Sequence, residues 1–160
     1  MEKKRLIIID ANSVIHRAYH AIRGLSSSRG IPTNAIFGFT KMILKLLHDT
    51  RPGYLAVVFD AKGPTFRHNI YKEYKATRPP MPVDLVEQIP YIKKIIKGFN
   101  VKSLEIEGYE ADDIIGTLAM RGAEEGFDVI IVSGDKDFKQ VISSRISLWD
   151  PMKGRYMSYD

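Results

Sequence analysis

The amino-acid sequence predicts an α/β fold in which a mostly parallel central sheet carries helices on both faces. Three short apolar runs without polar alternation have the pattern of strands buried on both faces: 5–10, 54–60 and 127–132. Segments with helical periodicity separate these runs, as in βαβ units. With 160 residues, 44% of them hydrophobic and 27% charged, the chain is long enough for one domain with a buried core.

The remaining elements follow in a regular order. A helix is expected directly after the first strand, and Gly98 and Gly126 stand where two later helical patterns stop. We expect longer helices over 34–48, 83–96 and 111–125, and further strands over 101–106, 146–149 and 155–159. Three prolines make 77–82 a stiff connector.

Composition excludes several classes of protein. The chain has no cysteine, which excludes disulfide scaffolds, thiolate metal sites and cysteine nucleophiles. No apolar run approaches the roughly 20 residues of a membrane helix. The apolar stretch after the basic N-terminus, 6–9, is too short for a signal peptide, so we expect a cytoplasmic protein. Sequence signatures of serine hydrolases, P-loop kinases and dinucleotide-binding domains are absent from the chain.

Acidic residues gather where the predicted parallel strands end. Asp10, Asp60 and Asp135 each follow a strand, and a further acidic group opens the helix predicted from Ala111. In open parallel sheets, ligands bind beyond the carboxyl ends of the strands. We therefore expect seven carboxylates from four segments to face one edge of the sheet: Asp10, Asp60, Glu110, Asp112, Asp113, Asp135 and Asp137.

Such a cluster predicts a metal site. Each acid alone could be a helix cap, which contributes about 0.3–1 kcal/mol. Seven converging carboxylates repel one another, and a polyvalent cation relieves that repulsion. Oxygen ligands without cysteine suit Mg²⁺ or Mn²⁺, and up to two such ions would serve phosphodiester hydrolysis. The alternative is a purely structural cluster.

The chain carries five more Lys and Arg than Asp and Glu, and most of this surplus lies in 62–78. Aromatic residues alternate with cations there, a composition suited to single-stranded nucleic acid. If the segment is helical, one face carries Arg67, Tyr71, Tyr74, Lys75 and Arg78. The alternative is a solvated helix whose tyrosines pack on the core. Arg17, in the first helix, is a further candidate for a phosphate contact.

Four segments resemble the 5′-nuclease domains found at the N-terminus of bacterial DNA polymerase I, which belong to the flap endonuclease family. These segments are 9–13, 66–79, 108–119 and 132–137. The Glu-Ala-Asp-Asp-Ile-Ile and Ser-Gly-Asp-Lys-Asp motifs are highly specific together. The resemblance implies a PIN-like fold over 1–160, with an arch at about 62–82 that guides the 5′ strand.

The resemblance also implies a structure-specific 5′-3′ exonuclease or flap endonuclease that hydrolyses DNA by divalent-metal catalysis, in primer removal and repair. The substrates would be DNA with 5′ flaps, forks, nicks or gaps, with RNA primers as further candidates. The seven carboxylates correspond to metal ligands, with Asp112, Asp113, Asp135 and Asp137 nearest the better-held ion. Lys75 and Arg78 correspond to catalytic cations, and Tyr74, Arg67 and Arg17 to nucleic-acid contacts.

The chain departs from this family at its end. The family continues with a helix-hairpin-type DNA-binding module that carries further aspartates, and often with a polymerase domain. We expect 1–160 to be a monomeric catalytic half without that module, so the second metal site would be incomplete. Two alternatives remain at this point: a non-catalytic DNA-binding fragment and a PIN-type ribonuclease.

Overall fold

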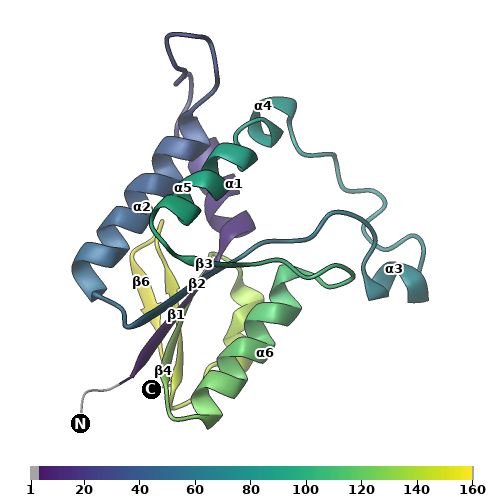
Figure 1. Cartoon of the computed structure of the whole chain (residues 1–160). Helices are drawn as coiled ribbons and strands as arrows, with labels where there is room; N and C mark the ends of the chain where they lie inside the picture. Colours follow the sequence, from purple (N-terminus) through teal and green to yellow (C-terminus); the bar gives the residue numbers. More distant parts are fainter. Residues whose placement is uncertain (1–3, 160) are drawn as a thin grey trace.

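The computed structural model describes residues 4–159, and its centre is a six-stranded sheet with helices on both faces (Figure 1). The strand order is β3-β2-β1-β4-β5-β6, and only the β5·β6 pair is antiparallel. The strands are β1 (Arg5–Asp10), β2 (Tyr54–Val58), β3 (Lys102–Leu104), β4 (Asp128–Val132), β5 (Ile146–Asp150) and β6 (Arg155–Met157). The predicted α/β class with a mostly parallel sheet is confirmed.

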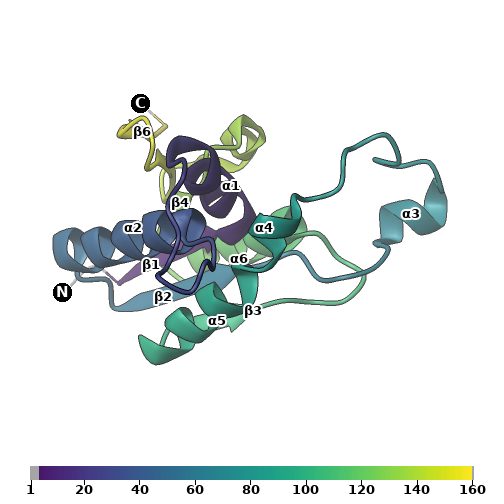
Figure 2. The ribbon, with the colours of Figure 1, turned by 90° about the horizontal axis from the view of Figure 1, so that it is seen from above.

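The helices form two layers around the sheet. Figures 1 and 2 show α1, α2 and α5 on one face and α6 on the other. The helices are α1 (Ala11–Ala21), α2 (Asn34–Thr50), α3 (Phe66–Ile70), α4 (Val83–Val86), α5 (Ile89–Gly98) and α6 (Ala111–Glu124), with a 3-10 helix over Lys136–Val141. Within 4–159, none of these helices combines the length and apolar character needed to cross a bilayer.

The core explains why the strands read as continuous apolar runs. Ile7 and Ile9 of β1 pack in the core under α1, α2 and α5, whereas Ile8 packs in the core under α6. All three side chains are fully buried. Because successive side chains of a strand point to opposite faces, a strand covered on both sides needs apolar residues at every position.

The direction in which successive strands are added to the sheet reverses at β1. The chain runs from β1 through β2 to β3 on one side, and then returns to β4 and β5 on the other. The carboxyl end of β1 therefore lies between those of β2 and β4. This is the position at which open α/β sheets form a ligand crevice.

The helix predicted over 83–96 is broken, because α4 ends at Val86 and α5 begins at Ile89. Pro90 stands in the first turn of α5. A helix running through Pro90 would lose one hydrogen bond and place the proline ring against the carbonyl of residue 86. The chain therefore restarts the helix just before the proline.

Gln88, which is fully buried, lies at this break. Its Oε1 accepts hydrogen bonds from the amides of Ala35 (2.8 Å) and Ile36 (3.1 Å) in the first turn of α2. Its Nε2 donates to Asn34 Oδ1 (2.7 Å) and to the carbonyl of Asp84 (3.0 Å). One side chain thus joins α4 and α5 to the amino end of α2.

The arch, residues 62–82, stands away from both helical layers (Figure 2). The segment 66–78 is not one helix, because α3 covers only Phe66–Ile70 and turns follow it, so the shared face that a helix would give does not form. Lys75 adopts a left-handed backbone conformation with φ of 56°. Residues with a side chain rarely adopt this conformation, and it interrupts a helix. Helical periodicity in the sequence therefore could not predict how the arch residues lie relative to one another.

We expect Gly38→Ala to destabilise the protein. A Cβ at Gly38 in α2 would lie 2.7 Å from Ala18 Cβ in α1, so the two helices would have to separate. Overpacking outweighs the gain in helix propensity, for a net loss of about 1–2 kcal/mol in the free energy of unfolding. Urea denaturation measures this loss.

Gly116→Ala is the matched control. In the described part of the chain, a Cβ at Gly116 of α6 would meet no atom within 4 Å apart from its chain neighbours and the backbone of its own helix. This substitution is expected to gain about 0.5–1 kcal/mol from helix propensity alone. Equal changes at Gly38 and Gly116 would contradict the close packing of α1 on α2.

Candidate metal centre and nucleic-acid interface

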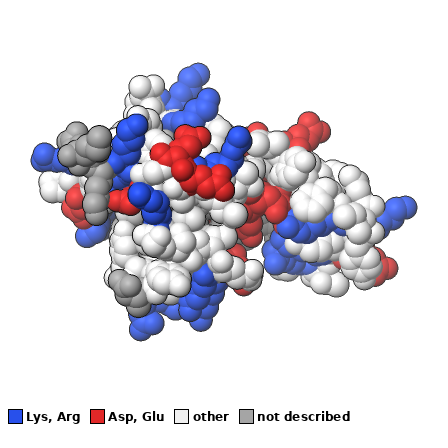
Figure 3. Space-filling model, turned by 90° about the horizontal axis from the view of Figure 1, so that it is seen from below, with Lys and Arg blue, Asp and Glu red and all other residues white. Residues whose placement is uncertain are grey.

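A cleft of about 340 Å³ opens at the carboxyl edge of the sheet. Carboxylates from β1, the end of β2, α6 and the segment after β4 form one part of its wall, and arch cations another. Acidic side chains lie where the arch meets the body, and patches of basic side chains lie on the arch (Figure 3). The charged residues that line the cleft are Asp10, Asp60, Glu110, Asp112, Asp135, Arg17, Lys75 and Arg78. Five of the seven predicted carboxylates thus line one cleft.

Asp10 lies at the floor of the cleft and is only 4% exposed. It caps α1 by accepting from the amide of Ser13 (3.4 Å), and it accepts from Ser133 Oγ (2.7 Å). Burial, with the negative charges of Asp112 and Asp60, raises its pKa to about 7 despite these hydrogen bonds. Burial is the largest cause of this rise in pKa, and the negative charges of Asp112 and Asp60 add to it.

Asp60 and Asp112 form the next part of the cleft wall. Asp60 accepts from Asn12 Nδ2 (2.8 Å) and from the amide of Ala111 (2.6 Å), which ties the end of β2 to the first turn of α6. Desolvation, then the charges of Asp135, Asp60 and Glu110, raise the pKa of Asp112 to about 6. The acids therefore repel one another when no cation stands between them.

The segment after β4 brings Asp135 into the cleft but not Asp137. Asp135 accepts from the amide of Asp137 (2.9 Å) and caps the 3-10 helix. Asp137 is exposed and does not line the cleft. Ser13 Oγ accepts from the amide of Gly134 (3.0 Å), so α1 positions this segment.

Glu110 is where the arch meets the acidic cluster. Its carboxylate accepts from Arg67 Nη1 (2.7 Å), from Tyr74 Oη (3.4 Å) and from Lys75 Nζ. Burial works against the charge of Lys75, but its hydrogen bonds to Glu110 and Tyr74 raise its pKa overall. Lys75 therefore stays protonated at neutral pH.

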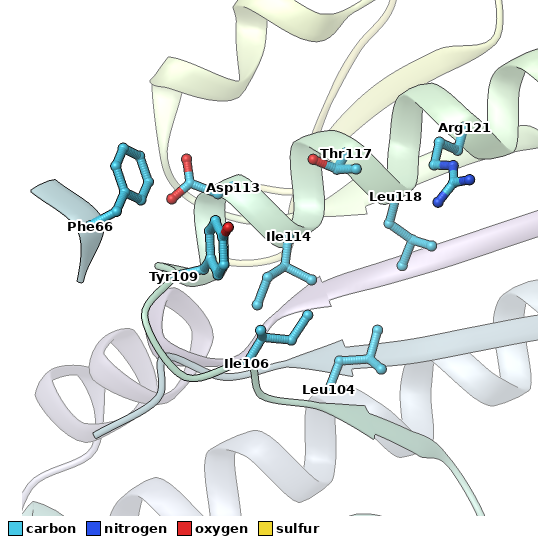
Figure 4. Close-up of a pocket in the computed structure, with 9 residues that line it drawn as sticks. All are labelled: Phe66, Leu104, Ile106, Tyr109, Asp113, Ile114, Thr117, Leu118 and Arg121. Carbon is cyan, nitrogen blue, oxygen red and sulfur yellow. The ribbon is translucent and has the colours of Figure 1, made fainter. Parts of the chain in front are cut away.

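Asp113 lies on the other side of the first turn of α6. It lines a separate apolar cleft of about 470 Å³ beside Phe66 and Tyr109, rather than the carboxylate cleft (Figure 4). Arg67 donates to both of its oxygens, at 2.7 and 2.8 Å. These hydrogen bonds lower the pKa of Asp113.

The donor set fits a hard divalent cation, although the side chains do not yet surround one point. Within 4–159, no three His, Asp or Glu side chains stand close enough together to hold one ion. However, five carboxylates line the cleft, and the pKa values of Asp10 and Asp112 are raised. A cation would relieve this repulsion.

The predicted nucleic-acid residues divide into two groups. Tyr74 contacts Glu110, Lys75 and Arg78 line the cleft, and Arg67 contacts Glu110 and Asp113. Tyr71 is exposed, and its hydroxyl donates to Glu73 (3.0 Å), away from the cleft.

Arg17, in α1, makes contacts that sequence alone could not predict. Its Nη1 lies 3.0 and 3.1 Å from the two carboxylate oxygens of buried Asp150, and its Nη2 donates to the carbonyl of Gly134 (3.3 Å). The partner is 133 residues away.

Sequence reasoning missed several residues of the cleft. Asn12, Ser13 and His16 line it beside Asp10, and Ser133 donates to Asp10. The position of Asn12 and Ser13 directly after a strand-end aspartate was the available signal. His16 follows Asn12 at helical i,i+4 spacing, and burial lowers its pKa.

Comparison with known proteins gives a consistent result. Residues 5–160 match the family described as "5′-3′ exonuclease, N-terminal resolvase-like domain". A DNA polymerase I of Caldicellulosiruptor bescii is 46% identical over 142 residues, which are 89% of this chain and 17% of that protein. A 5′-3′ exonuclease of Aquifex aeolicus is 46% identical over 149 residues, 93% of this chain and 52% of that protein.

Solved structures share the fold. The T5 5′-exonuclease with bound zinc superposes with a TM-score of 0.71 at 20% identity, covering 96% of this chain and 58% of that one. A T5 flap endonuclease variant in complex with DNA and metal ions gives 0.69 at 18% identity, over 96% and 57% of the two chains. Because the family match covers nearly the whole sequence, the chain belongs to the family of 5′-3′ exonuclease N-terminal resolvase-like domains.

Proposed function

We propose that this chain is the catalytic part of a structure-specific 5′-3′ exonuclease or flap endonuclease that hydrolyses DNA phosphodiester bonds with divalent cations. The cleft is the observation that carries the proposal, because strand-end carboxylates and the arch cations Lys75 and Arg78 line the same space. Carboxylates hold cations and arch cations hold phosphates, so the cleft offers both halves of a phosphodiesterase site.

The cations would be Mg²⁺ or Mn²⁺, held by the carboxylates that line the cleft. The T5 relative crystallises with bound zinc, which supports a divalent cation in the proposal. When bound, such an ion would lower the pKa of a coordinated water and supply positive charge that stabilises the phosphate during hydrolysis. The ligands would be the carboxylates that line the cleft, Asp10, Asp60, Glu110, Asp112 and Asp135, whereas Asp137 is exposed and does not line it.

The arch residues would hold the scissile phosphate. Lys75 is protonated and Arg78 lines the same cleft, so both place positive charge where the phosphate would lie. Tyr74, beside Lys75, offers a ring for a base of the single strand. Binding of the phosphate would draw Lys75 away from Glu110, which frees that carboxylate for a cation.

The substrates would be DNA with 5′ flaps, forks, nicks or gaps, in primer removal and repair. The DNA complex of the T5 relative and the DNA polymerase I relatives support DNA over RNA. The chain spans about half of the exonuclease relative, so a further DNA-binding module belongs to the proposal, as do the monomeric state and the cytoplasmic location.

Cleavage of a 5′-labelled flap DNA tests the function. We expect products near the junction with Mg²⁺ or Mn²⁺, no products with chelator, and none from Asp135→Asn, which keeps the hydrogen-bond acceptor for Asp137. DNA that binds but is not cut under any condition would instead identify a DNA-binding fragment. Faster cleavage of RNA than of flap DNA would identify a ribonuclease.

Lys75→Ala is expected to slow cleavage and to weaken DNA binding. One phosphate contact fewer lowers the slope of log binding constant against log salt by roughly 1. Fluorescence anisotropy with flap DNA across a salt series measures this slope. Lys41→Ala, an exposed cation on α2, is the control and should keep the wild-type slope. If both variants show the same salt slope of DNA binding, Lys75 does not contact a phosphate.

A further inference from the structure

Arg67 hydrogen-bonds to two carboxylates at the start of α6, those of the N-cap Glu110 and of Asp113. It lies 2.7 Å from Glu110 and donates two hydrogen bonds to Asp113, and its side chain is only 33% exposed. Its guanidinium also packs over the ring of Phe66, 4.5 Å from the centroid. These hydrogen bonds use three of the five N–H donors of the guanidinium, and the two carboxylates balance its positive charge.

These contacts close a ring around Glu110. Asp113 accepts from the backbone amide of Glu110 (3.3 Å) and from Arg67, and Arg67 donates to the side chain of Glu110. The Arg67–Asp113 pair therefore holds both the backbone and the carboxylate of Glu110. Because Asp113 lies outside the carboxylate cleft, it acts on the cleft only through these neighbours.

The same pair joins the arch to the body of the protein. The amide of Phe66, the first residue of α3, donates to the carbonyl of Gly108 (2.8 Å). Arg67 is the next residue, so consecutive residues of the arch contact the turn that precedes α6 and the first turn of α6 itself.

We propose that Arg67 and Asp113 are positioning residues: the pair orients Glu110 towards the cleft and holds the N-terminal end of the arch on α6. This deepens the proposed function, and it reassigns Arg67 from DNA contact and Asp113 from metal ligand. Lys75 and Arg78 are then the arch cations that line the cleft and face the substrate.

A charge-conserving double-mutant cycle tests the positioning role. Lysine lacks the planar fork that engages two oxygens of Asp113, and glutamate displaces the carboxylate by one methylene. Arg67→Lys and Asp113→Glu should each weaken Mn²⁺ binding, measured by electron paramagnetic resonance, by roughly tenfold or more. The double variant should bind Mn²⁺ with about the same affinity as whichever single variant has the lower affinity. Effects that add would make Asp113 an independent ligand and overturn the proposal.

Salt dependence separates positioning from DNA contact. Arg67→Gln should keep the wild-type salt slope of flap-DNA binding, whereas Arg78→Gln, the matched arginine of the arch, should lower it by roughly 1. A lower slope for Arg67→Gln would restore Arg67 as a phosphate contact.

Hydrogen exchange tests the pair without any metal or DNA. Amides in 66–70 should exchange at least several-fold faster in Arg67→Lys than in wild type, because the arch loses its hold on α6. Unchanged exchange there would overturn the proposal even if the protein cleaves DNA. Faster exchange in a protein that neither binds Mn²⁺ nor cuts DNA would refute the proposed function but keep the positioning role.

Discussion

Asp112→Asn is expected to reduce metal-dependent cleavage by roughly a thousandfold or more, the equivalent of about 4 kcal/mol of transition-state stabilisation. Asp112 faces the cleft, and no hydrogen bond to its carboxylate is found within 4–159. Asparagine has nearly the same shape, so the substitution removes a charge and little else. Single-turnover cleavage of flap DNA measures the loss, with Glu124→Gln at the far end of α6 as the control.

The same variant should be more stable than wild type when chelator is present. The pKa of Asp112 is raised to about 6, so its ionised form costs stability as the pH rises from its unfolded value through 6. The amide that replaces this carboxylate never carries the charge. The gain in melting temperature should therefore be largest at pH 8, smaller at pH 5 and absent near pH 3, and Mg²⁺ should stabilise the variant less than wild type. A variant less stable than wild type at pH 8 would contradict the repulsion within the cluster.

Gln88→Met is expected to lower the free energy of unfolding by about 3 kcal/mol, because the change keeps the side-chain volume but leaves buried amides without an acceptor. The amides of Ala35 and Ile36 lose their partner, and so does Asn34 Oδ1. For a chain of this size the loss corresponds to a fall of roughly 6–12 °C in melting temperature.

Gln140, an exposed glutamine in the 3-10 helix, provides the control. Gln140→Met should change the melting temperature by little. Because Gln88 joins α4 and α5 to α2, its loss should also loosen the C-terminal end of the arch. A Gln88→Met protein as stable as Gln140→Met would show that the buried hydrogen bonds contribute nothing net.

Most of the fold could be predicted because burial on both faces leaves a direct mark on the sequence. The runs that became β1, β2 and β4 are apolar at nearly every position, and Gly126 marks the end of α6 correctly. The break between α4 and α5 was predictable in principle from Pro90. The early end of α3 could not be predicted, because contacts of Tyr74 and Lys75 with Glu110 at the start of α6, rather than local propensity, set the turns that follow it.

The site could be predicted in outline but not in detail. Strand-end acids must meet at one edge of a parallel sheet, and five of the seven line one cleft. Which way each side chain turns depends on partners far away in sequence, such as Arg67 for Asp113 and Asp150 for Arg17. Local pattern contains no information about such pairings.

The N-terminal part of the arch rests on α6 through Arg67, and the chain that follows the arch is held on α2, in the opposite layer, through Gln88. The stretch between them, 77–80, is exposed. Insertions are tolerated best where few contacts would break, and doubling the length of a flexible loop costs only about 0.6 kcal/mol. Evolution could therefore lengthen this stretch and change the width of the opening beneath it, while both anchors and the cleft stay in place.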